Sequence, residues 1–588
     1  MCGIFGYVGK RDNVPVLIFE GLKTLEYRGY DSWGITIKDG PFLDFEKHVG
    51  KIGDNKLTLA KNKSKLGIGH TRWATHGGVS VKNAHPHLDC TKKIAVLHNG
   101  IIENFAKLKE ELIKKGHIFY SETDTEVVPH LIEEYLKTQD FTKSVQSSFK
   151  RLEGLNAIVV AYAPSSEIIA AKTGSPLVIG KGEDEFFIAS DILGIIKYTN
   201  KILFLKDNEM VVLGKKIQLF SLPSGKSKQP SFQSVDWKIE EANLGSFPHF
   251  MIKEIYDQPK VIINIAQNYK EEIKKLSSII AKAKGTFFIG AGTAYHAALG
   301  GTYLFSKIAK EHINTAVASE FNYLEDFLTS KSLIIALSQS GETIDVVEPL
   351  TRAKKKGSTI VSITNSLGSS IYRMSDHKLM LGAGPEKAVA STKAYLAKLA
   401  VLLMLSFALK KNVDKAGEIL IKTAEEIKRI LETKNLKKIK DLAHLLSSSE
   451  HMYVIGRGFS YSSALEAALK IKEVSYIHTE GLAGGELKHG TIALISEGTP
   501  CLVFAPKDDT YQSILSNAIE IKSRGGLIIG ISPENSPVFD YWLEVKDLSF
   551  GSYLAQSVPA QLLAYYIAAN KNLDPDKPRN LAKSVTVK

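Results

Sequence analysis

The chain has 588 residues, of which 44% are hydrophobic and 23% charged, and its formal net charge is +12. At roughly 100–200 residues per domain, this length predicts three or four folded units, which excludes disorder as the dominant state. The positive charge is mild and forms no dense basic stripe with interleaved aromatic residues. Nucleic acid is therefore not an expected partner, whereas a small anionic substrate would suit the charge.

The number of cysteines and the length of the apolar runs indicate the cellular location of the protein. Cys2, Cys90 and Cys501 are too few for a disulfide framework and lack the spacing of metal ligands, so we expect a reducing, cytoplasmic location and no metal. The N-terminus has neither the basic nor the apolar region of a signal peptide. The longest apolar run, Leu399 to Leu409, is shorter than the about 20 residues that span a bilayer. It predicts a buried helix and no membrane partner.

Residues 1–220 combine short apolar runs and turn signals with isolated helical patterns. The runs are 66–69, 94–97, 157–163 and 186–189, and the helical patterns are 14–25 and 125–136. Strands interrupted by single helices predict a layered α/β or α+β domain with antiparallel sheets. Residues 221–245 begin with a polar stretch rich in Pro, Gly and Ser, which predicts a hydrated linker.

From about Gly285 the chain repeats the order apolar strand, Gly/Ser turn, helix, which is typical of parallel sheets. Residues 287–295 match 453–461 at an offset of 166, and 356–361 match 524–529 at an offset of 168. Two matches at nearly the same offset predict a duplicated, doubly wound parallel sheet. We place the two copies at 246–425 and 426–569, joined by a helical stretch at 413–446 and followed by an ordered tail, 570–588.

Cys2 becomes the first residue if Met1 is removed, and cysteine is small enough to permit that removal. The chain then begins with a thiol beside an α-amine. An amine that titrates near ~8 can act as the base that turns the thiol into a thiolate. Such a nucleophile needs no second side chain, although most Met-Cys starts have no such role.

Three segments after Cys2 contain groups suited to glutamine chemistry. Arg72 offers a bidentate fork for a carboxylate. The Asn99 side-chain N–H and the Gly100 backbone N–H could form an oxyanion hole. Thr123 is expected to cap a helix, and Asp124 could bind an ammonium group. Taken singly, these residues are equally explained as a buried structural arginine, an Asn-Gly turn and a simple cap.

A phosphate site is predicted where the strand 333–337 runs into the segment Ser-Gln-Ser-Gly-Glu-Thr at 338–343. Hydroxyl and backbone N–H groups at a helix N-terminus bind anions, and the helix dipole favours the negative charge. No Gly-Lys-Ser/Thr follows, so the segment is not a P-loop. An ordinary strand–helix turn is the alternative. The residues that can surround a phosphate without a metal are Ser338, Gln339, Ser340 and Thr343.

The second copy contains candidate acid–base groups. Glu466, Lys470 and Glu473 stand at i, i+4 and i+7 of a strong helix former, so they share one face. A solvated salt-bridge face is the alternative, but this helix follows a Gly-rich turn above a parallel strand, where such folds bind ligands. His489 follows, and an imidazole, which titrates near neutrality, can open a sugar ring by proton transfer.

The motifs together resemble a known family over nearly the whole chain. Cys2-Gly3-Ile4 and the segments 70–77, 98–104 and 121–126 resemble a class-II glutamine amidotransferase domain. The later motifs narrow the resemblance to the glucosamine-6-phosphate synthases, the isomerising glutamine–fructose-6-phosphate aminotransferases. This resemblance implies an N-terminal nucleophile αββα glutaminase domain followed by two sugar isomerase domains.

The resemblance also implies roles for individual residues. Cys2 would attack the glutamine amide with its α-amine as general base, and Asn99 and Gly100 would hold the oxyanion. Trp73 would gate an internal ammonia path, and the glutamine-binding residues would be Arg72, Trp73, Thr75, His76 and Asp124. Glu473 would move the proton between C1 and C2, His489 would open the ring, Glu466 and Lys470 would assist, and Lys583 would form a Schiff base. The sugar-phosphate residues would be Thr293, Ser338, Gln339, Ser340, Thr343, Val389 and Ser391.

The implied reaction converts D-fructose 6-phosphate and L-glutamine to D-glucosamine 6-phosphate and L-glutamate. It needs only proton transfer, so no cofactor is expected, and members of the family usually form homodimers. A different ketose phosphate, or a non-catalytic sugar-phosphate sensor, remains an alternative, although Cys2 and Lys583 argue against the sensor. The sequence departs from the family at Ala294, where bacterial members often have Ser, and at the terminal Lys588, where relatives usually have Glu.

The duplication predicts that only the first copy binds the phosphate. An offset of 168 places Ser338-Gln339-Ser340 opposite Pro506-Lys507-Asp508. Pro506 has no N–H to donate, and the carboxylate of Asp508 would repel a phosphate dianion. The second copy would supply the acid–base groups instead.

Overall fold

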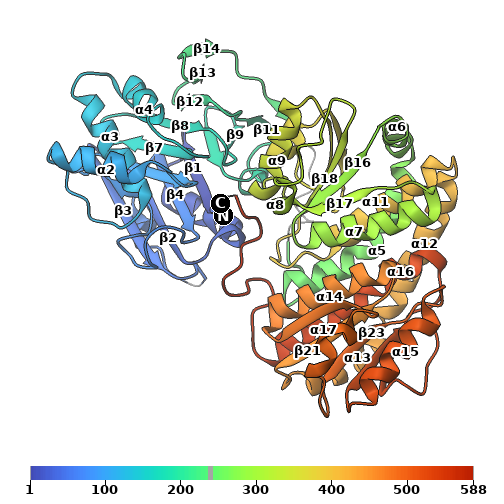
Figure 1. Cartoon of the computed structure of the whole chain (residues 1–588). Helices are drawn as coiled ribbons and strands as arrows, with labels where there is room; N and C mark the ends of the chain where they lie inside the picture. The colour runs from blue at the N-terminus through green and yellow to red at the C-terminus, as the bar shows by residue number, and fades with distance from the viewer. Residues whose placement is uncertain (1, 54, 236–242, 587–588) are drawn as a thin grey trace. The chain divides into compact units, whose positions relative to one another are not determined.

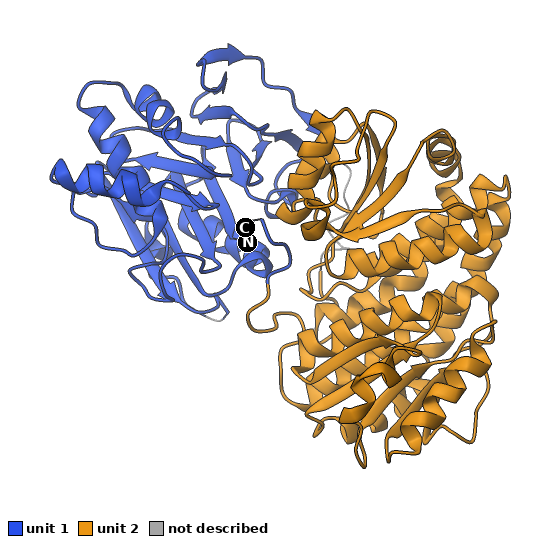
Figure 2. Cartoon of the chain, viewed as in Figure 1, with its two compact units in different colours: residues 1–242, 582–588 blue, residues 243–581 orange. Residues whose placement is uncertain are grey.

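The computed structural model describes residues 2–53, 55–235 and 243–586. Contacts divide the chain into two compact units, residues 1–242 with 582–588, and residues 243–581 (Figure 2). Met1, the central part of the predicted linker (236–242) and the last two residues of the predicted tail lie outside the described residues.

The first unit is built on two antiparallel sheets. Figure 1 labels most of their strands. The order is β15-β11-β9-β10-β1-β4-β2-β3 in the first sheet and β14-β13-β12-β8-β7-β6-β5 in the second. The strands of the first sheet are β1 (Gly3–Val8), β2 (Ser32–Asp39), β3 (Phe42–Val49), β4 (Leu66–Arg72), β9 (Val178–Lys181), β10 (Phe186–Ala189), β11 (Lys201–Phe204) and β15 (Gln233–Ser234). Those of the second are β5 (His87–Leu88), β6 (Ile94–Asn99), β7 (Ala157–Tyr162), β8 (Ile168–Lys172), β12 (Glu209–Leu213), β13 (Ile217–Ser221) and β14 (Lys226–Lys228).

Side chains of β6 alternate between two cores, because successive strand residues point to opposite faces of a sheet. Ala95 and Leu97 pack with Ile4 of the other sheet, whereas Ile94 and Val96 pack on the opposite face with residues of the helices. These helices are α2 (Phe105–Lys114), α3 (Val127–Leu136) and α4 (Phe141–Phe149), while α1 (Val14–Leu25) packs on β1 and β4 of the first sheet. The layers are helix, sheet, sheet and helices, which confirms the predicted αββα arrangement.

The structure differs from the predicted linker at its start. Strand β14 pairs with β13, and β15 pairs with β11, so the chain remains part of the two sheets as far as Ser234. Every residue of β14 and β15 is exposed. Such strands have no apolar alternation from which a sequence could reveal them. By contrast, α1 and β10 have the predicted bounds, and α3 begins at Val127 because a 3-10 turn, Asp124–Glu126, precedes it.

The second unit contains two parallel sheets of the same topology. Their strand orders are β17-β16-β18-β19-β20 and β22-β21-β23-β24-β25, which is 2-1-3-4-5 when each copy is numbered by itself. The predicted duplication is therefore confirmed. The first sheet consists of β16 (Thr286–Gly290), β17 (Asn314–Val317), β18 (Leu333–Ser338), β19 (Thr359–Thr364) and β20 (His377–Met380). The second consists of β21 (His451–Gly456), β22 (His478–Ala483), β23 (Pro500–Phe504), β24 (Leu527–Ser532) and β25 (Tyr541–Glu544).

The first strand–helix turn is nearly identical in the two copies. Gly292 precedes α7 (Thr293–Leu304) with φ 53° and ψ −127°, and Gly458 precedes α14 (Phe459–Ser475) with φ 55° and ψ −130°. A residue with a Cβ is strained at such a positive φ, so both positions favour glycine. In doubly wound sheets of this order, ligands bind at the carboxyl ends of the first and third strands, where the strand order reverses.

Strand pairing corrects the predicted match between the two copies. Ile289 pairs with Ala336, and Ile455 pairs with Val503, so the offset is 166 at the first strand and 167 at the third. It reaches 168 only at the fourth strand. Ser338 therefore corresponds to Ala505 rather than Pro506, and Asp508 corresponds to Gly341. The sequence match at 356 and 524 lies beyond both inserted residues, which explains the error of one position.

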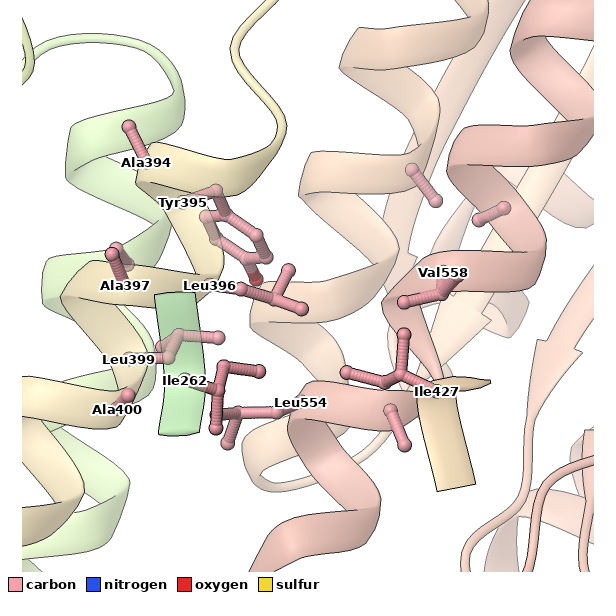
Figure 3. Packing of buried hydrophobic residues seen from close by; sticks show 14 of the residues in the cluster. Ile262, Ala394, Tyr395, Leu396, Ala397, Leu399, Ala400, Ile427, Leu554 and Val558 are labelled. Atoms are coloured by element: carbon pink, nitrogen blue, oxygen red, sulfur yellow. The ribbon is translucent and has the colours of Figure 1, made fainter. Parts of the chain in front are cut away.

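The core of the second unit surrounds α11 (Lys393–Leu409), whose residues from Lys393 to Ser406 are all buried. Figure 3 shows its apolar side chains near those of α5 (Phe250–Asn268), α12 (Val413–Ile430), α16 (Ser552–Ala555) and α17 (Ser557–Asn570). The apolar run from Leu399 lies in this buried helix, as predicted. No helix in the described ranges is long and apolar enough to cross a membrane.

The remaining helices cover the two parallel sheets. They are α6 (Lys270–Ile280), α8 (Ala318–Phe321), α9 (Ile344–Lys355), α10 (Ser370–Met374), α13 (Thr433–Leu446) and α15 (Tyr511–Lys522). The predicted helical stretch 413–446 is two helices, α12 and α13, separated at Leu431 and Glu432.

Candidate active sites

Cys2 stands immediately before β1, and its thiol lies against the peptide of Trp73. The Trp73 N–H donates to Sγ at 3.2 Å, and Sγ lies 3.6 Å from the Trp73 carbonyl oxygen. The carbonyl oxygen of Cys2 accepts hydrogen bonds from Arg28 Nε at 3.2 Å and from Asn99 Nδ2 at 3.0 Å. Burial raises the pKa of the Cys2 thiol, although nearby Arg72 and Arg28 oppose the rise. The resting nucleophile is therefore a neutral thiol that needs a base.

Asn99 ends β6, and a buried histidine sets the orientation of its amide. His70 Nε2 lies 3.1 Å from Asn99 Oδ1 and 3.1 Å from the His98 carbonyl oxygen. Burial lowers the pKa of His70 to about 3, so its ring is neutral and can donate from Nε2. With Oδ1 accepting that hydrogen, Asn99 Nδ2 becomes the end that faces Cys2.

Gly100 follows Asn99 with φ 127°, a conformation that favours glycine. A Cβ built at this position would lie 2.3 Å from the carbonyl oxygen of Leu155. Any side chain would therefore displace the backbone beside Asn99. The glycine allows the chain to turn sharply just after the predicted oxyanion donor.

Arg72 and Asp124, the predicted glutamine-binding pair, are both buried and close enough to interact electrostatically. The Arg72 guanidinium donates to the carbonyl oxygens of His76, Gly77 and Gly78 at 2.5, 3.0 and 3.3 Å. Asp124 Oδ2 accepts from the Ile102 N–H at 2.8 Å. Both charges are thus positioned by backbone groups, and their contact with glutamine stays a prediction.

Thr123 occupies the predicted cap position, but its hydroxyl does not cap the helix. It lies 3.1 Å from His87 Nε2 and 3.0 Å from Ser121 Oγ. The sequence identifies the cap position, but the Thr123 hydroxyl forms its hydrogen bonds with His87 of β5 and with Ser121.

The remaining predicted glutamine residues lie on the turn after β4. Trp73 makes an edge contact with Tyr30, with ring centroids 5.6 Å apart, and His76 makes one with Phe105 at 5.6 Å. Thr75 is exposed. Asp31 Oδ2 accepts from the Ala74 N–H at 2.8 Å, which ties this turn to the start of β2.

Glu466, Lys470 and Glu473 share one face of α14, as predicted, and this face is not solvated. Glu466 and Lys470 are each 1% exposed, and Lys470 Nζ lies 3.5 Å from Glu466 Oε1 and contacts Glu473 Oε2. Burial alone would lower the pKa of Lys470, but the carboxylates of Glu473, Glu466 and Glu386 outweigh it and raise the pKa. The ammonium therefore stays protonated, and the half-buried Glu473 is the more accessible carboxylate on this face.

The two copies meet at Glu466. Thr293 Oγ1 of α7 donates to Glu466 Oε1 at 3.1 Å, and His296 Nδ1 lies 2.8 Å from Glu466 Oε2. The Thr293 hydroxyl, predicted to bind sugar phosphate, is thus a partner of Glu466 in this structure. The first copy supplies hydrogen bonds to a buried carboxylate of the second.

The predicted phosphate segment folds tightly at the carboxyl end of β18, before α9. Ser338 Oγ accepts from the Gly341 N–H at 2.9 Å, and Ser340 Oγ accepts from the Glu342 N–H at 3.2 Å. Gly341 has φ 65°, and a Cβ there would lie 2.0 Å from Ser369 Oγ. Gln339 and Thr343 are half-buried, and the Thr343 backbone caps α9. The four predicted residues share the loop at the point of strand reversal.

The corresponding loop of the second copy contains its own carboxylate. Asp508 Oδ1 accepts from the Thr510 N–H at 2.8 Å and from the Thr510 hydroxyl at 2.7 Å. Its Oδ2 accepts from the Tyr553 hydroxyl at 2.8 Å. The Asp508 carboxylate thus accepts hydrogen bonds from Thr510 and Tyr553, and the predicted difference in phosphate binding between the copies stays a prediction.

Val389 and Ser391 precede α11, and both form hydrogen bonds with other residues of the second unit. The Val389 N–H donates to the Asp576 carbonyl oxygen at 3.0 Å, and the Ser391 hydroxyl donates to Glu386 Oε2 at 3.0 Å. Glu386 Oε1 accepts from the Thr392 and Ala394 N–H groups and so caps the helix. The tail beyond α17 thus packs beside Val389.

The structure does not bring His489 into the buried cluster on α14. His489 is exposed on the 3-10 turn Leu487–His489. Lys583 is half-buried. It lies in the segment of the tail that belongs to the first unit, whereas Glu473 belongs to the second unit. The roles of both residues stay predictions.

The sequence interpretation missed four residues that position the predicted ones: Arg28, Asp31, His296 and Glu386. Glu386 caps α11 from six and eight positions away, whereas the other three act across 26, 43 and 170 positions, the last between His296 and Glu466. A single sequence carries no signal for such pairs. His70 was noticed only as part of a motif, without its role on Asn99.

Comparison with known families agrees with the two units. Residues 70–197 match the glutamine amidotransferase domain, and residues 279–408 and 445–571 match the SIS domain.

Curated relatives match the chain over its full length. A glutamine–fructose-6-phosphate aminotransferase (isomerizing) from Thermococcus kodakarensis is 43% identical over 602 residues, and one from Pyrococcus horikoshii is 44% identical over 603. Both alignments cover 100% of each chain.

Solved structures resemble the second unit. The C-terminal domain of glucosamine-fructose-6-phosphate aminotransferase from Francisella tularensis is 32% identical with a TM-score of 0.54, covering 57% of this chain and 100% of its own. A tagatose-6-phosphate ketose/aldose isomerase from Escherichia coli is 17% identical with a TM-score of 0.51, covering 57% of this chain and 96% of its own. The second likeness concerns the fold alone.

Proposed function

The chain belongs to the family of isomerising glutamine–fructose-6-phosphate aminotransferases, and we propose that its two units divide that reaction between them. It converts D-fructose 6-phosphate and L-glutamine to D-glucosamine 6-phosphate and L-glutamate, a reaction of amino-sugar synthesis. The first unit would release ammonia from glutamine, and the second would transfer it to the sugar. Ammonia would pass inside the protein, with Trp73 as its gate.

In the glutaminase half, the α-amine of the processed Cys2 takes the thiol proton, and the sulfur attacks the amide carbon. Asn99 Nδ2 and the Gly100 N–H hold the resulting oxyanion. Ammonia leaves, and water then hydrolyses the thioester to glutamate. The observation that carries this proposal is the 3.0 Å contact between Asn99 Nδ2 and the Cys2 carbonyl oxygen, because it places the donor beside the nucleophile.

Recognition of glutamine would use opposite charges for its two backbone groups. Arg72 would bind the carboxylate and Asp124 the ammonium, while Thr75 and His76 on the same turn would close over the amino acid. Both charges are buried and anchored by hydrogen bonds to or from the backbone, so they keep their positions before glutamine arrives.

In the sugar half, His489 opens the ring, and Lys583 forms an imine with the ketose carbonyl while the carbonyl oxygen leaves as water. Ammonia displaces the lysine, and Glu473 moves a proton between C1 and C2. Lys470 keeps a positive charge beside Glu473, and Glu466 holds Lys470 in place. Incubating the enzyme with glutamine and a series of ketose phosphates, with glutamate and amino sugar measured in parallel, tests both halves. Equal turnover of the other ketose phosphates would favour the alternative substrate.

Replacing Ser340 by alanine is expected to weaken fructose 6-phosphate binding about tenfold or more. Losing one hydrogen bond to a charged group costs roughly 1.5–3 kcal/mol, and 1.4 kcal/mol is a factor of ten. Glutamine hydrolysis should survive, because Ser340 lies in the other unit. Isothermal titration calorimetry with fructose 6-phosphate measures the change in affinity.

Asp508→Asn is the matched control in the second copy. The oxygen of the new amide can still accept from Thr510, the amide N–H can donate to the Tyr553 hydroxyl, and the charge is removed. We expect nearly unchanged sugar binding and one phosphosugar per chain. Two bound per chain, or an equal loss in Asp508→Asn and Ser340→Ala, would show that the copies do not differ in this way.

We also propose that the enzyme is a cytoplasmic homodimer. The cytoplasm keeps Cys2 reduced, as a thiol nucleophile requires. The turns that carry His489 also carry Leu494, a residue that is 64% exposed, and we place the contact with a second copy there. Sedimentation equilibrium should give twice the chain mass, and Leu494→Asp should shift the equilibrium toward single chains. A wild-type protein that sediments as a single chain would contradict the dimer.

A further inference from the structure

Four potential metal ligands converge on the outer side of the first unit, from three separate segments of the chain. Cys90 lies in the turn between β5 and β6, His117 follows α2, and His130 and Glu133 lie one turn apart on α3. One donor atom from each residue lies within 4.8 Å of the others. His117 and His130 are 7% and 0% exposed, so both imidazoles are buried.

Five of the six separations between donor atoms are close to those of a tetrahedron around one small ion, and the sixth, from Cys90 Sγ to the Glu133 carboxylate, is within 4.8 Å. Cys90 Sγ lies 3.6 Å from Nδ1 of His117 and 3.6 Å from Nδ1 of His130, and the two Nδ1 atoms are 3.2 Å apart. Glu133 Oε2 lies 3.0 Å from His117 Nδ1 and 3.3 Å from His130 Nδ1. Tetrahedral zinc, with bonds of about 2.0–2.3 Å, places neighbouring ligand atoms about 3.3–3.6 Å apart.

A carboxylate next to the cluster orients His117 in the way that is usual for histidines that bind metal ions. His117 Nε2 lies 2.9 Å from Glu134 Oε1, so its N–H is directed away from the cluster and Nδ1 presents a lone pair. Glu134 is itself held by Lys115 and Lys137. A carboxylate behind the histidine is the usual arrangement at zinc sites.

We propose that Cys90, His117, His130 and Glu133 bind one zinc ion. A thiolate with two imidazoles selects a borderline-soft ion rather than magnesium or calcium, and tetrahedral geometry favours zinc. Four protein ligands leave no open position for a substrate, so the site is structural. Binding releases the Cys90 thiol proton to solvent, and zinc affinity therefore falls as the pH is lowered.

The site would stabilise the segments that carry the glutamine-binding residues. The 3-10 turn that begins at Asp124 leads into α3, and β6, which follows the Cys90 turn, ends at Asn99. The ion would join the turn before β6 to α3 through bonds that do not depend on apolar packing. Zinc is expected to raise the unfolding temperature of the first unit, because a ligand that binds only the folded state stabilises it.

Cobalt titration of the full chain tests the proposal. The chain is prepared in a Cys2→Ala background, so that the nucleophilic thiol is not a ligand, and it is stripped with a chelator. We expect one Co²⁺ per chain, with a thiolate-to-cobalt charge-transfer band and the d–d bands of a tetrahedral ion. Zinc should displace the cobalt. Elemental analysis of protein purified from zinc-containing medium should give about one zinc per chain.

Variants locate the ion. Cys90→Ser is suitable because Cys90 is exposed, and it should abolish the charge-transfer band. Glu134→Gln should weaken zinc binding about 10–100-fold, the usual effect of removing such a carboxylate partner. The matched control is His478→Ala in the second unit, which removes one of two exposed histidines whose Nδ1 atoms are 3.3 Å apart without a thiol. It should leave the band unchanged.

Two results would overturn the proposal. One is a wild-type chain that binds zinc no more tightly than Cys90→Ser. The other is a charge-transfer band that persists in Cys90→Ser, since the thiolate ligand would then be elsewhere. If only hydrogen bonds hold the four side chains together, the wild-type chain and Cys90→Ser should bind zinc equally weakly. Zinc should then leave the unfolding temperature unchanged.

Discussion

Replacing Cys2 by alanine is expected to lower glutamine hydrolysis by at least about 10⁴-fold, since loss of a catalytic nucleophile typically costs that much or more. Synthesis of glucosamine 6-phosphate from added ammonia should continue, because the Cys2 thiol has no proposed role in the sugar chemistry. Glutamate release from glutamine and amino sugar formed from ammonium chloride are the two measurements.

The pH dependence of the wild-type enzyme follows from the same chemistry. Burial raises the pKa of the Cys2 thiol, so the thiol is neutral in the resting enzyme and must lose its proton to the α-amine. Only the unprotonated amine can accept it, so glutamine hydrolysis should rise with pH through the titration of an amine near ~8. A rate that falls over this range would contradict the amine as base.

Cys501→Ala is the matched control for Cys2→Ala. Cys501 is buried in β23 of the second unit, so it removes a thiol without touching the glutaminase site. It should leave glutamine hydrolysis unchanged. Mass spectrometry of the active enzyme should show that the chain begins at Cys2. Retention of Met1 on fully active protein would rule out the N-terminal nucleophile.

The second large effect is expected at Lys583. Borohydride reduction in the presence of fructose 6-phosphate should attach one sugar to Lys583, because reduction converts an imine to a stable amine. Lys583→Arg keeps the positive charge but forms no imine under these conditions. It should lose both the label and the formation of glucosamine 6-phosphate. Peptide mass spectrometry after reduction identifies the modified residue.

Lys571→Ala provides the comparison for labelling, since it removes another lysine that follows α17. It should be labelled as strongly as the wild type. Equal labelling in Lys583→Arg would falsify the assignment, and the imine would then have to be sought on another lysine, such as the buried Lys470. Binding of fructose 6-phosphate measured separately distinguishes loss of the imine from loss of the substrate.

The strongest predictions from the sequence concern features that depend on neighbouring residues. Helix α1 begins and ends where its apolar periodicity indicates, and Gly292 and Gly458 mark the same turn in both copies because their positive φ favours glycine. The i, i+4, i+7 spacing placed Glu466, Lys470 and Glu473 on one face, since helical geometry is local. The motifs around Cys2 and Asn99 likewise identified groups that the fold brings together.

Tertiary structure decided the features that depend on distant partners. The exposed strands β14 and β15 form only because other strands offer them an edge, so they were taken for a linker. The second copy has one extra residue before β23 and another before β24. Strand pairing detects each of them and places Asp508 opposite Gly341. The sequence match lies beyond both extra residues, so its offset is one too large for the loop after β23. Tertiary packing buries the charged face of α14, so its ion pairs are shielded from water. Folding also brings Cys90, His117, His130 and Glu133 together. Their spacing along the chain carries no such signal, because the contacts depend on the packing of three segments.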